Sequence, residues 1–91
     1  MTASTISQET EILSRVIAPD NPNLSSEAAR SILALRFSDA DNEQMNALAA
    51  KNRLGGLDAQ EKSLLNAYLV VGSLVDLMHS KARLSMAKNR A

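Results

Sequence analysis

The side chains that could carry chemistry in this chain are few, and none occurs in a pattern that an enzyme or a metal site needs. His79 is the only histidine, and no serine or carboxylate is spaced around it as in a catalytic triad. Asp39, Asp41 and Glu43 alternate as at the start of a calcium-binding loop, but Gln44 occupies the position where such a loop needs glycine. We therefore expect a protein that is not an enzyme and that has no metal, no cofactor and no small-molecule substrate.

The glycine pair Gly55 and Gly56 follows a helical pattern instead of preceding one. A phosphate-binding loop needs its glycines before a helix, where free backbone N–H groups point at the anion. The pair therefore predicts a helix end, with one of the two glycines at positive φ.

Basic residues gather at the end of a chain whose net charge is zero. No acidic residue follows Asp76, and the basic residues after it are Lys81, Arg83, Lys88 and Arg90. Such an ending complements the dipole of a C-terminal helix, or it contacts phosphates or an acidic partner. Without interleaved aromatic residues it is a weak signal for nucleic acid, so we keep a nucleic-acid-associated accessory protein as an alternative.

The composition indicates one small all-α domain. Of the 91 residues 45% are hydrophobic, and the only aromatic residues are Phe37 and Tyr68, so the core must consist of aliphatic side chains. The chain has no cysteine and no apolar run near the roughly 20 residues of a membrane span. We expect no membrane association and a cytoplasmic location.

Turn and capping signals predict a short N-terminal helix over residues 5–17, a proline-containing linker to residue 23, and then three helices over residues 25–36, 39–54 and 59–88. The last two helices should form an αα-hairpin in which the C-terminal helix is much the longer. We accordingly divide the chain into an N-terminal amphipathic segment with its linker, residues 1–23, and a helical domain, residues 24–91.

The long C-terminal helix carries an apolar stripe with a spacing of 4-3-4-3-4, which is typical of a helix-packing seam. Its members are Leu64, Tyr68, Val71, Val75, Met78 and Ala82. We expect Leu64, Tyr68, Val71 and Val75 to be buried, and Gly72 to mark a close helix crossing. Since the preceding helix is about half as long, the rest of this helix must pack on the second helix, the first helix or another chain.

Apolar residues that this arrangement leaves over are candidates for partner binding, namely Ile12, Leu13, Val16, Ile17, Leu77 and Leu84. They favour a non-enzymatic protein-binding module that binds another protein or a second copy of itself. A closed helical monomer is an equal alternative on the argument of size, and a structural homodimer is a third.

The stretches LSSEAARSILALRFSDADNEQMNALAAKNRLGGL and LLNAYLVVGSLVDLMHSKAR cover most of residues 24–83. They resemble a group of uncharacterised small all-helical bacterial proteins of cyanobacterial and planctomycete type, several of which are encoded beside an HNH-type nuclease. The resemblance implies an antitoxin-like or immunity-like partner that restrains a neighbouring nuclease. Residues 1–23 lie outside it.

Overall fold

The computed structural model describes the chain from residue 2 to residue 90, with side chains from residue 8 onward, and this part contains four helices and no strand. The helices are α1 (Thr2–Ile17), α2 (Ser26–Leu33), α3 (Asp39–Arg53) and α4 (Ala59–Arg90). The all-α class is therefore confirmed. Helix α1 begins three residues earlier than predicted, and α2 ends three residues earlier.

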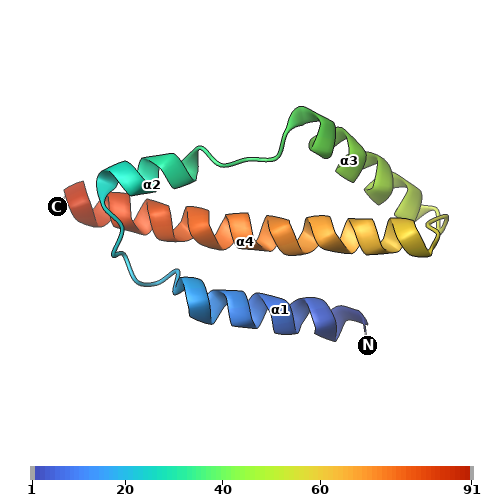
Figure 1. Ribbon diagram of the computed structural model, residues 1–91, viewed down its shortest axis with the longest axis horizontal. Helices are drawn as coiled ribbons and strands as arrows, with labels where there is room; N and C mark the ends of the chain where they lie inside the picture. The colour runs from blue at the N-terminus through green and yellow to red at the C-terminus, as the bar shows by residue number, and fades with distance from the viewer. Residues whose placement is uncertain (1, 91) are drawn as a thin grey trace.

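Helix α4 is the axis of the molecule (Figure 1). Helices α2 and α3 follow one another along one side of α4 and run against its direction, whereas α1 lies along the other side and runs with it. The molecule measures 50 × 29 × 16 Å. Because a single helix with its side chains is about 10–12 Å across, the protein is a flattened molecule less than two helix diameters thick.

Local capping interactions fix where the helices begin. Ser25 and Ser38 each accept a hydrogen bond from the backbone N–H three residues later, at 3.1 Å in both cases. Before α4, the Glu61 N–H donates to the Asp58 carboxylate at 2.8 Å, and the Asp58 N–H donates back to the Glu61 carboxylate at 3.0 Å. These reciprocal bonds satisfy backbone N–H groups that have no partner in the first helical turn.

Gly55 has a φ of +73°, which confirms the predicted positive φ at the glycine pair. The Gly56 N–H donates to the carbonyl of Lys51 at 3.1 Å and so closes the end of α3. A side chain at position 55 would be strained by this backbone conformation, although no atom lies near enough to contact it.

The hydrophobic core is small and lies between α3 and the first half of α4. Its buried members are Leu48, Leu57 and Tyr68, against which the half-buried residues Phe37, Met45 and Leu65 pack. Phe37 meets Tyr68 edge to face, with ring centroids 5.7 Å apart and an interplanar angle of 72°. The linker between α2 and α3 therefore supplies the aromatic side chain that closes this core.

A second, separate contact holds α2 against the last third of α4. Ala29, Ala82 and Ser85 are fully buried, and their small side chains allow the two helix backbones to approach closely. The Leu24 N–H donates to Ser85 Oγ at 3.2 Å, and Asn89 Nδ2 donates to the Leu24 carbonyl at 3.1 Å. Leu24, two residues before α2, is thus bonded to α4 through both of its backbone polar groups.

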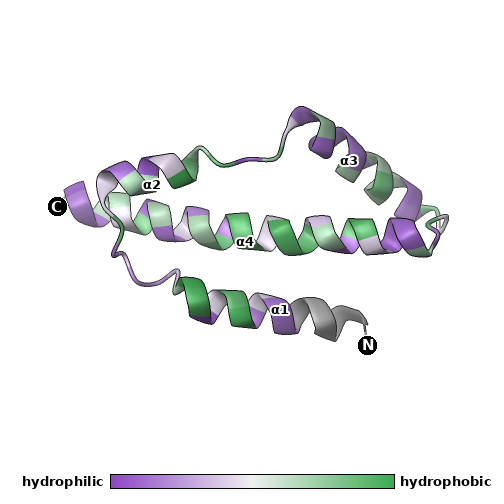
Figure 2. Ribbon diagram, in the orientation of Figure 1, coloured by the Kyte–Doolittle hydropathy of each residue, from purple (hydrophilic) through white to green (hydrophobic). Residues whose placement is uncertain are grey.

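The predicted seam of α4 is wrong at two of the four positions that were expected to be buried. Leu64 and Val71 are 37% and 44% exposed, although Tyr68 is buried and Val75 half-buried. Figure 2 shows hydrophobic residues interspersed with hydrophilic ones along α4, and the polarity of a residue does not decide which side is covered.

The side of α4 that is covered repeats with a spacing of 3-4-3-4-3, and its members are Leu65, Tyr68, Gly72, Val75, His79 and Ala82. A Cβ at Gly72 would lie 3.9 Å from Phe37 Cε2, so the glycine packs against a linker side chain and not at a helix crossing. His79 Nε2 donates to the Leu35 carbonyl of the same linker at 2.9 Å. Gly72 and His79 lie on the covered side because the linker contacts them, through the Phe37 ring and the Leu35 carbonyl respectively.

Candidate protein-binding surface

Helix α1 is attached to α4 at its C-terminal end. Lys81 Nζ donates to the Ile17 carbonyl at 2.6 Å, where the C-terminus of a helix attracts a positive charge. Ala18 follows with a φ of +51°, which ends the helix, and its N–H donates to the Ser14 carbonyl at 2.8 Å. Lys81 was a predicted phosphate contact, and the structure uses it within the chain instead.

The four apolar residues predicted on α1 divide into two pairs. Leu13 and Ile17 are half-buried, on the side of α1 that meets α4. Ile12 and Val16 are 52% and 77% exposed. Only Ile12 and Val16 are therefore exposed to a partner, because Leu13 and Ile17 dock α1 on its own chain.

The two apolar candidates on α4 lie near the bend after α1. Leu77 is half-buried, whereas Leu84 is 45% exposed. Together with Pro19, Asp20 and Arg83 they line a depression that is open to solvent. Leu77 belongs to the side of α4 that faces α1, so only Leu84 remains a free apolar side chain.

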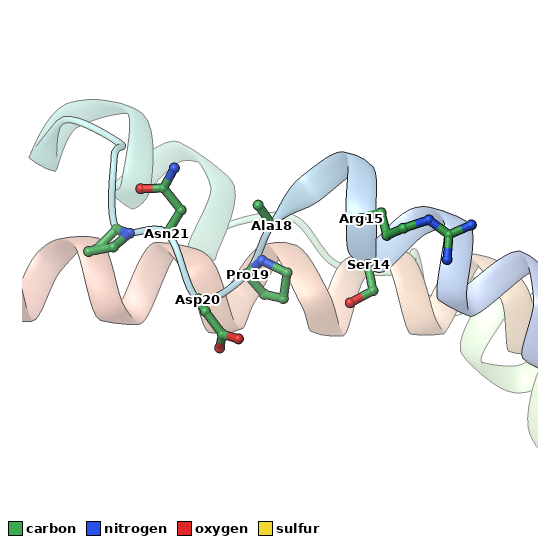
Figure 3. Close-up of a pocket in the computed structure, with 7 residues that line it drawn as sticks. Ser14, Arg15, Ala18, Pro19, Asp20 and Asn21 are labelled. Atoms are coloured by element: carbon green, nitrogen blue, oxygen red, sulfur yellow. The ribbon is translucent and has the colours of Figure 1, made fainter.

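A neighbouring depression at the bend is lined by the last turn of α1 and the start of the linker (Figure 3). Its labelled residues include Arg15 and Asp20, whose side chains project away from one another, and no charged group converges with another there. In the part of the chain with described side chains, no three His, Cys, Asp or Glu residues are grouped as metal ligands. These depressions are products of the bend and offer no arrangement that performs a reaction.

Two polar interactions shift pKa values, and both stabilise the fold. Tyr68 Oη donates to the Asp41 carboxylate at 2.7 Å, which lowers the pKa of Asp41, with help from the Ser38 hydroxyl, and raises the pKa of Tyr68. Lys51 Nζ and Glu61 lie 2.8 Å apart, which raises the pKa of Lys51 and lowers that of Glu61. Each pair joins α3 to α4. Of the acidic residues at the start of α3, Asp41 is therefore held in place by its bond to the core residue Tyr68.

Helix periodicity separates the two broad sides of the molecule. Residues seven apart lie on nearly the same side of a helix, since successive residues are about 100° apart. The seam faces α2 and α3, and the opposite side of α4 carries half-buried Val70, Leu74 and Leu77 toward α1. Of the two remaining sides of α4, the one that carries Leu64 and Val71 is open only in its first part, because Ser85 in the same row is fully buried beside Leu24.

One broad face carries a group of exposed apolar residues, and exposed Glu9, seven residues before Val16 on α1, borders the group. Leu64, Val71 and Met78 are seven residues apart and project to it from α4, with Ala67 between them. Because α1 faces α4 and runs parallel to it, the helical sense puts Ile12 and Val16 on this same face. We call the following set the apolar face: Ile12, Val16, Leu64, Ala67, Val71 and Met78. Of these residues only Met78 is as much as half-buried.

The other broad face is charged. Lys62, Asp76 and Arg83 are exposed and project from α4 in a second row of seven-residue spacing, which includes Leu69 as its one apolar member, 48% exposed. We call this row the charged face. The exposed basic residues Lys88 and Arg90 lie beyond it in the last turn of α4. Three of the four predicted phosphate contacts thus remain accessible to solvent.

Sequence reasoning missed the apolar face because it assigned Leu64, Val71 and Met78 to the core. The available signal was an excess of apolar positions, since α4 carries more of them than one seam can hold. A seam that keeps Tyr68 and Val75 but runs through Leu65 and Gly72 leaves Leu64 and Val71 exposed.

Comparisons of the chain with protein families, with characterised proteins and with solved structures find no significant match. The resemblance to small helical bacterial proteins therefore stays a prediction. Among the described residues, no helix has both the length and the apolar character needed to cross a bilayer.

Proposed function

We propose that this protein is a non-enzymatic binding module that docks onto another protein chain through its apolar face. The observation that supports the proposal is the unequal chemistry of the two broad faces of a flattened molecule. Val71 and Val16 are 44% and 77% exposed on one face, whereas the charged face carries ionised residues. A contiguous apolar surface bordered by polar residues is the usual mark of a protein-binding site.

In this proposal the αα-hairpin of α3 and α4, and the proline-containing linker after α1, serve to hold the face flat. The core between α3 and α4 fixes the first half of the long helix, and α2 fixes the second half. Lys81 holds α1 beside α4. A preorganised surface loses little conformational entropy on binding, which favours affinity.

A nuclease in the same cytoplasm is the specific heteromeric partner that we propose. The reason is the resemblance of residues 24–83 to proteins encoded beside an HNH-type nuclease, which implies an antitoxin-like or immunity-like role. Asp39 and Glu43 are exposed at the start of α3 and are free to meet a basic cleft, whereas Asp41 is bonded to Tyr68. Binding to nucleic acid is the weaker alternative, because Lys81 is engaged with α1 and the remaining basic residues are few.

A capture experiment with two matched variants tests the proposal. Val71→Asp and Leu69→Asp place the same charge on α4 at positions of similar exposure, 44% and 48%, on opposite faces. The immobilised wild-type chain and the Leu69→Asp variant should retain the same protein, identified by mass spectrometry, and the Val71→Asp variant should lose it. Equal retention by both variants would exclude the apolar face as the binding site.

A further inference from the structure

The turn that joins α1 to the rest of the chain holds one residue in an unfavourable backbone conformation. Ala18 has a φ of +51°, and among the described residues it is the only one other than glycine with a positive φ. This region brings a Cβ too close to the following carbonyl oxygen. In addition, Pro19 favours extended backbone in the residue before it. The sequence at Ala18 therefore opposes the conformation that the structure shows.

The contacts that impose this conformation fix the chain on both sides of Ala18. Before it, Lys81 Nζ donates to the Ile17 carbonyl at 2.6 Å. After it, Leu24 is bonded to α4 through its N–H and its carbonyl. Between these two points the chain must pass from the α1 side of α4 to the α2 side (Figure 1). If the bond at Ile17 breaks, only one point stays fixed and the strain at Ala18 can relax.

Helix α1 is held less firmly than the other three helices. None of its described side chains, residues 8–17, is buried, whereas α2, α3 and α4 each contain at least one buried residue. The hydrophobic core joins α3 to α4, and the contact between small residues joins α2 to α4. Neither contains a described side chain of α1. An element with few buried contacts can open while the rest of a protein stays folded.

The turn also has room to rotate. Ala18, Pro19 and Asp20 line the depression at the bend, which is open to solvent (Figure 3). A change of φ at Ala18 would swing the 16 residues of α1, a rod about 24 Å long, away from α4. Leu24 stays bonded to α4 during this motion, so α2 keeps its place.

We infer that α1 is a strained lid on α4, which opens as a unit about a hinge at Ala18 while α2, α3 and α4 stay folded. In the closed state the lid covers the half-buried residues Val70, Leu74 and Leu77 of α4. Opening exposes them and removes the part of the apolar face that α1 carries. The inference goes beyond the proposed function, because the hinge opens whatever protein the apolar face binds.

Native-state amide hydrogen exchange, followed by NMR, tests the inference on the purified chain and three variants. Ala18→Gly removes the strain, and Ala18→Val increases it, because a β-branched residue is a clear outlier at positive φ. Ala34→Gly is the matched control, since Ala34 ends α2 at a φ of −80° and has no such strain to relieve. In the wild type, the amides of α1 should exchange together, faster than those of α3 by roughly tenfold or more.

The two hinge variants should change exchange in α1 in opposite directions. Ala18→Gly should slow it by about threefold, because the strain that is relieved exceeds the backbone freedom that glycine adds to the open state. Ala18→Val should speed it by about tenfold. Exchange in α3 should stay as in the wild type in both variants, and Ala34→Gly should leave exchange in α1 unchanged.

One common exchange rate for α1 and α3 in the wild type would show that α1 opens only with global unfolding, and would overturn the inference. It would also be overturned if α1 exchanged no more slowly in Ala18→Gly than in the wild type, because no strain would then be stored at the hinge. Circular dichroism reports whether Ala18→Val folds, and Ala18→Gly provides the test if it does not. These measurements need no partner, so their outcome is independent of the capture experiment that tests the proposed function.

Discussion

Replacing Gly72 by alanine should stabilise this protein, although the glycine lies in the packed seam of α4. The residue is in the interior of a helix, and its φ is not in the left-handed region. Alanine is favoured over glycine in a helix by about 1 kcal/mol. The added Cβ would lie 3.9 Å from Phe37 Cε2, which is an ordinary van der Waals contact and brings no clash.

The expected gain is therefore about 1 kcal/mol in the free energy of unfolding, which for a domain of this size raises the melting temperature by about 4–8 °C. Urea unfolding followed by circular dichroism, at one fixed protein concentration, measures it. The matched control is Gly55→Ala, the same chemical change at a φ of +73°. It should destabilise the protein by about 1–2 kcal/mol, because alanine is strained in that conformation.

A destabilised Gly72→Ala variant would show that the glycine is in tighter contact than the space beside Phe37 allows. A Gly55→Ala variant of unchanged stability would argue against a positive φ at Gly55 at the end of α3.

Three further changes test the contacts that join the elements. Tyr68→Phe should lower the free energy of unfolding at neutral pH, and denaturation curves should show a weaker dependence of that free energy on pH at both acid and alkaline pH. In the wild type, the lowered pKa of Asp41 contributes stability above the ordinary carboxyl pKa of 3.8, and this contribution is lost as the pH falls. The raised pKa of Tyr68 contributes stability below the ordinary pKa of 10.0, and this contribution is lost as the pH rises. An unchanged pH profile would show that the hydroxyl does not bond Asp41. Ser85→Ala should cost about 1–3 kcal/mol in urea unfolding, because the Leu24 N–H loses its acceptor, and a neutral result would argue against that bond. Lys81→Met should speed amide hydrogen exchange in α1 while leaving exchange in α3 unchanged. Equal protection of α1 in the wild type and in Lys81→Met would show that the lysine does not hold α1.

The starts of α2, α3 and α4 were predictable because their signals are local, whereas α1 begins three residues earlier than predicted. Ser25 and Ser38 each bond to a backbone N–H only three residues away, and the glycine pair ends α3 by its own backbone geometry. Such interactions depend on a few neighbouring residues and not on the rest of the fold. Helix class and most boundaries therefore follow from the sequence.

The covered side of α4 was not predictable, because tertiary contacts choose it. Gly72 and His79 are not hydrophobic, so an apolar pattern does not include them. They are covered because Gly72 lies beside the Phe37 ring and His79 bonds to the Leu35 carbonyl. Leu64 and Val71 fit an apolar stripe equally well and are exposed. Tyr68, Val75 and Ala82 belong to both the predicted stripe and the covered side, and only the residues between them change, by one position each.

The candidate surface was predicted in part for a similar reason. Ile12 and Val16 were identified from their apolar character, and both are exposed. Leu13 and Ile17 have the same character but dock α1 on α4. Nothing in residues 5–17 alone shows which half of the apolar surface meets the chain's own helix, since that depends on the bond from Lys81, 64 residues further along the chain.

The most direct test of the apolar face as a binding surface is an isotope-filtered NMR experiment on the methyl-labelled chain mixed with the unlabelled protein that it captures. It detects only contacts between the two different proteins. The methyl groups of Val16 and Val71 should show intermolecular cross-peaks, and those of Leu69 on the charged face should show none. Intermolecular cross-peaks at Leu69 with none at Val16 or Val71 would contradict the proposed interface.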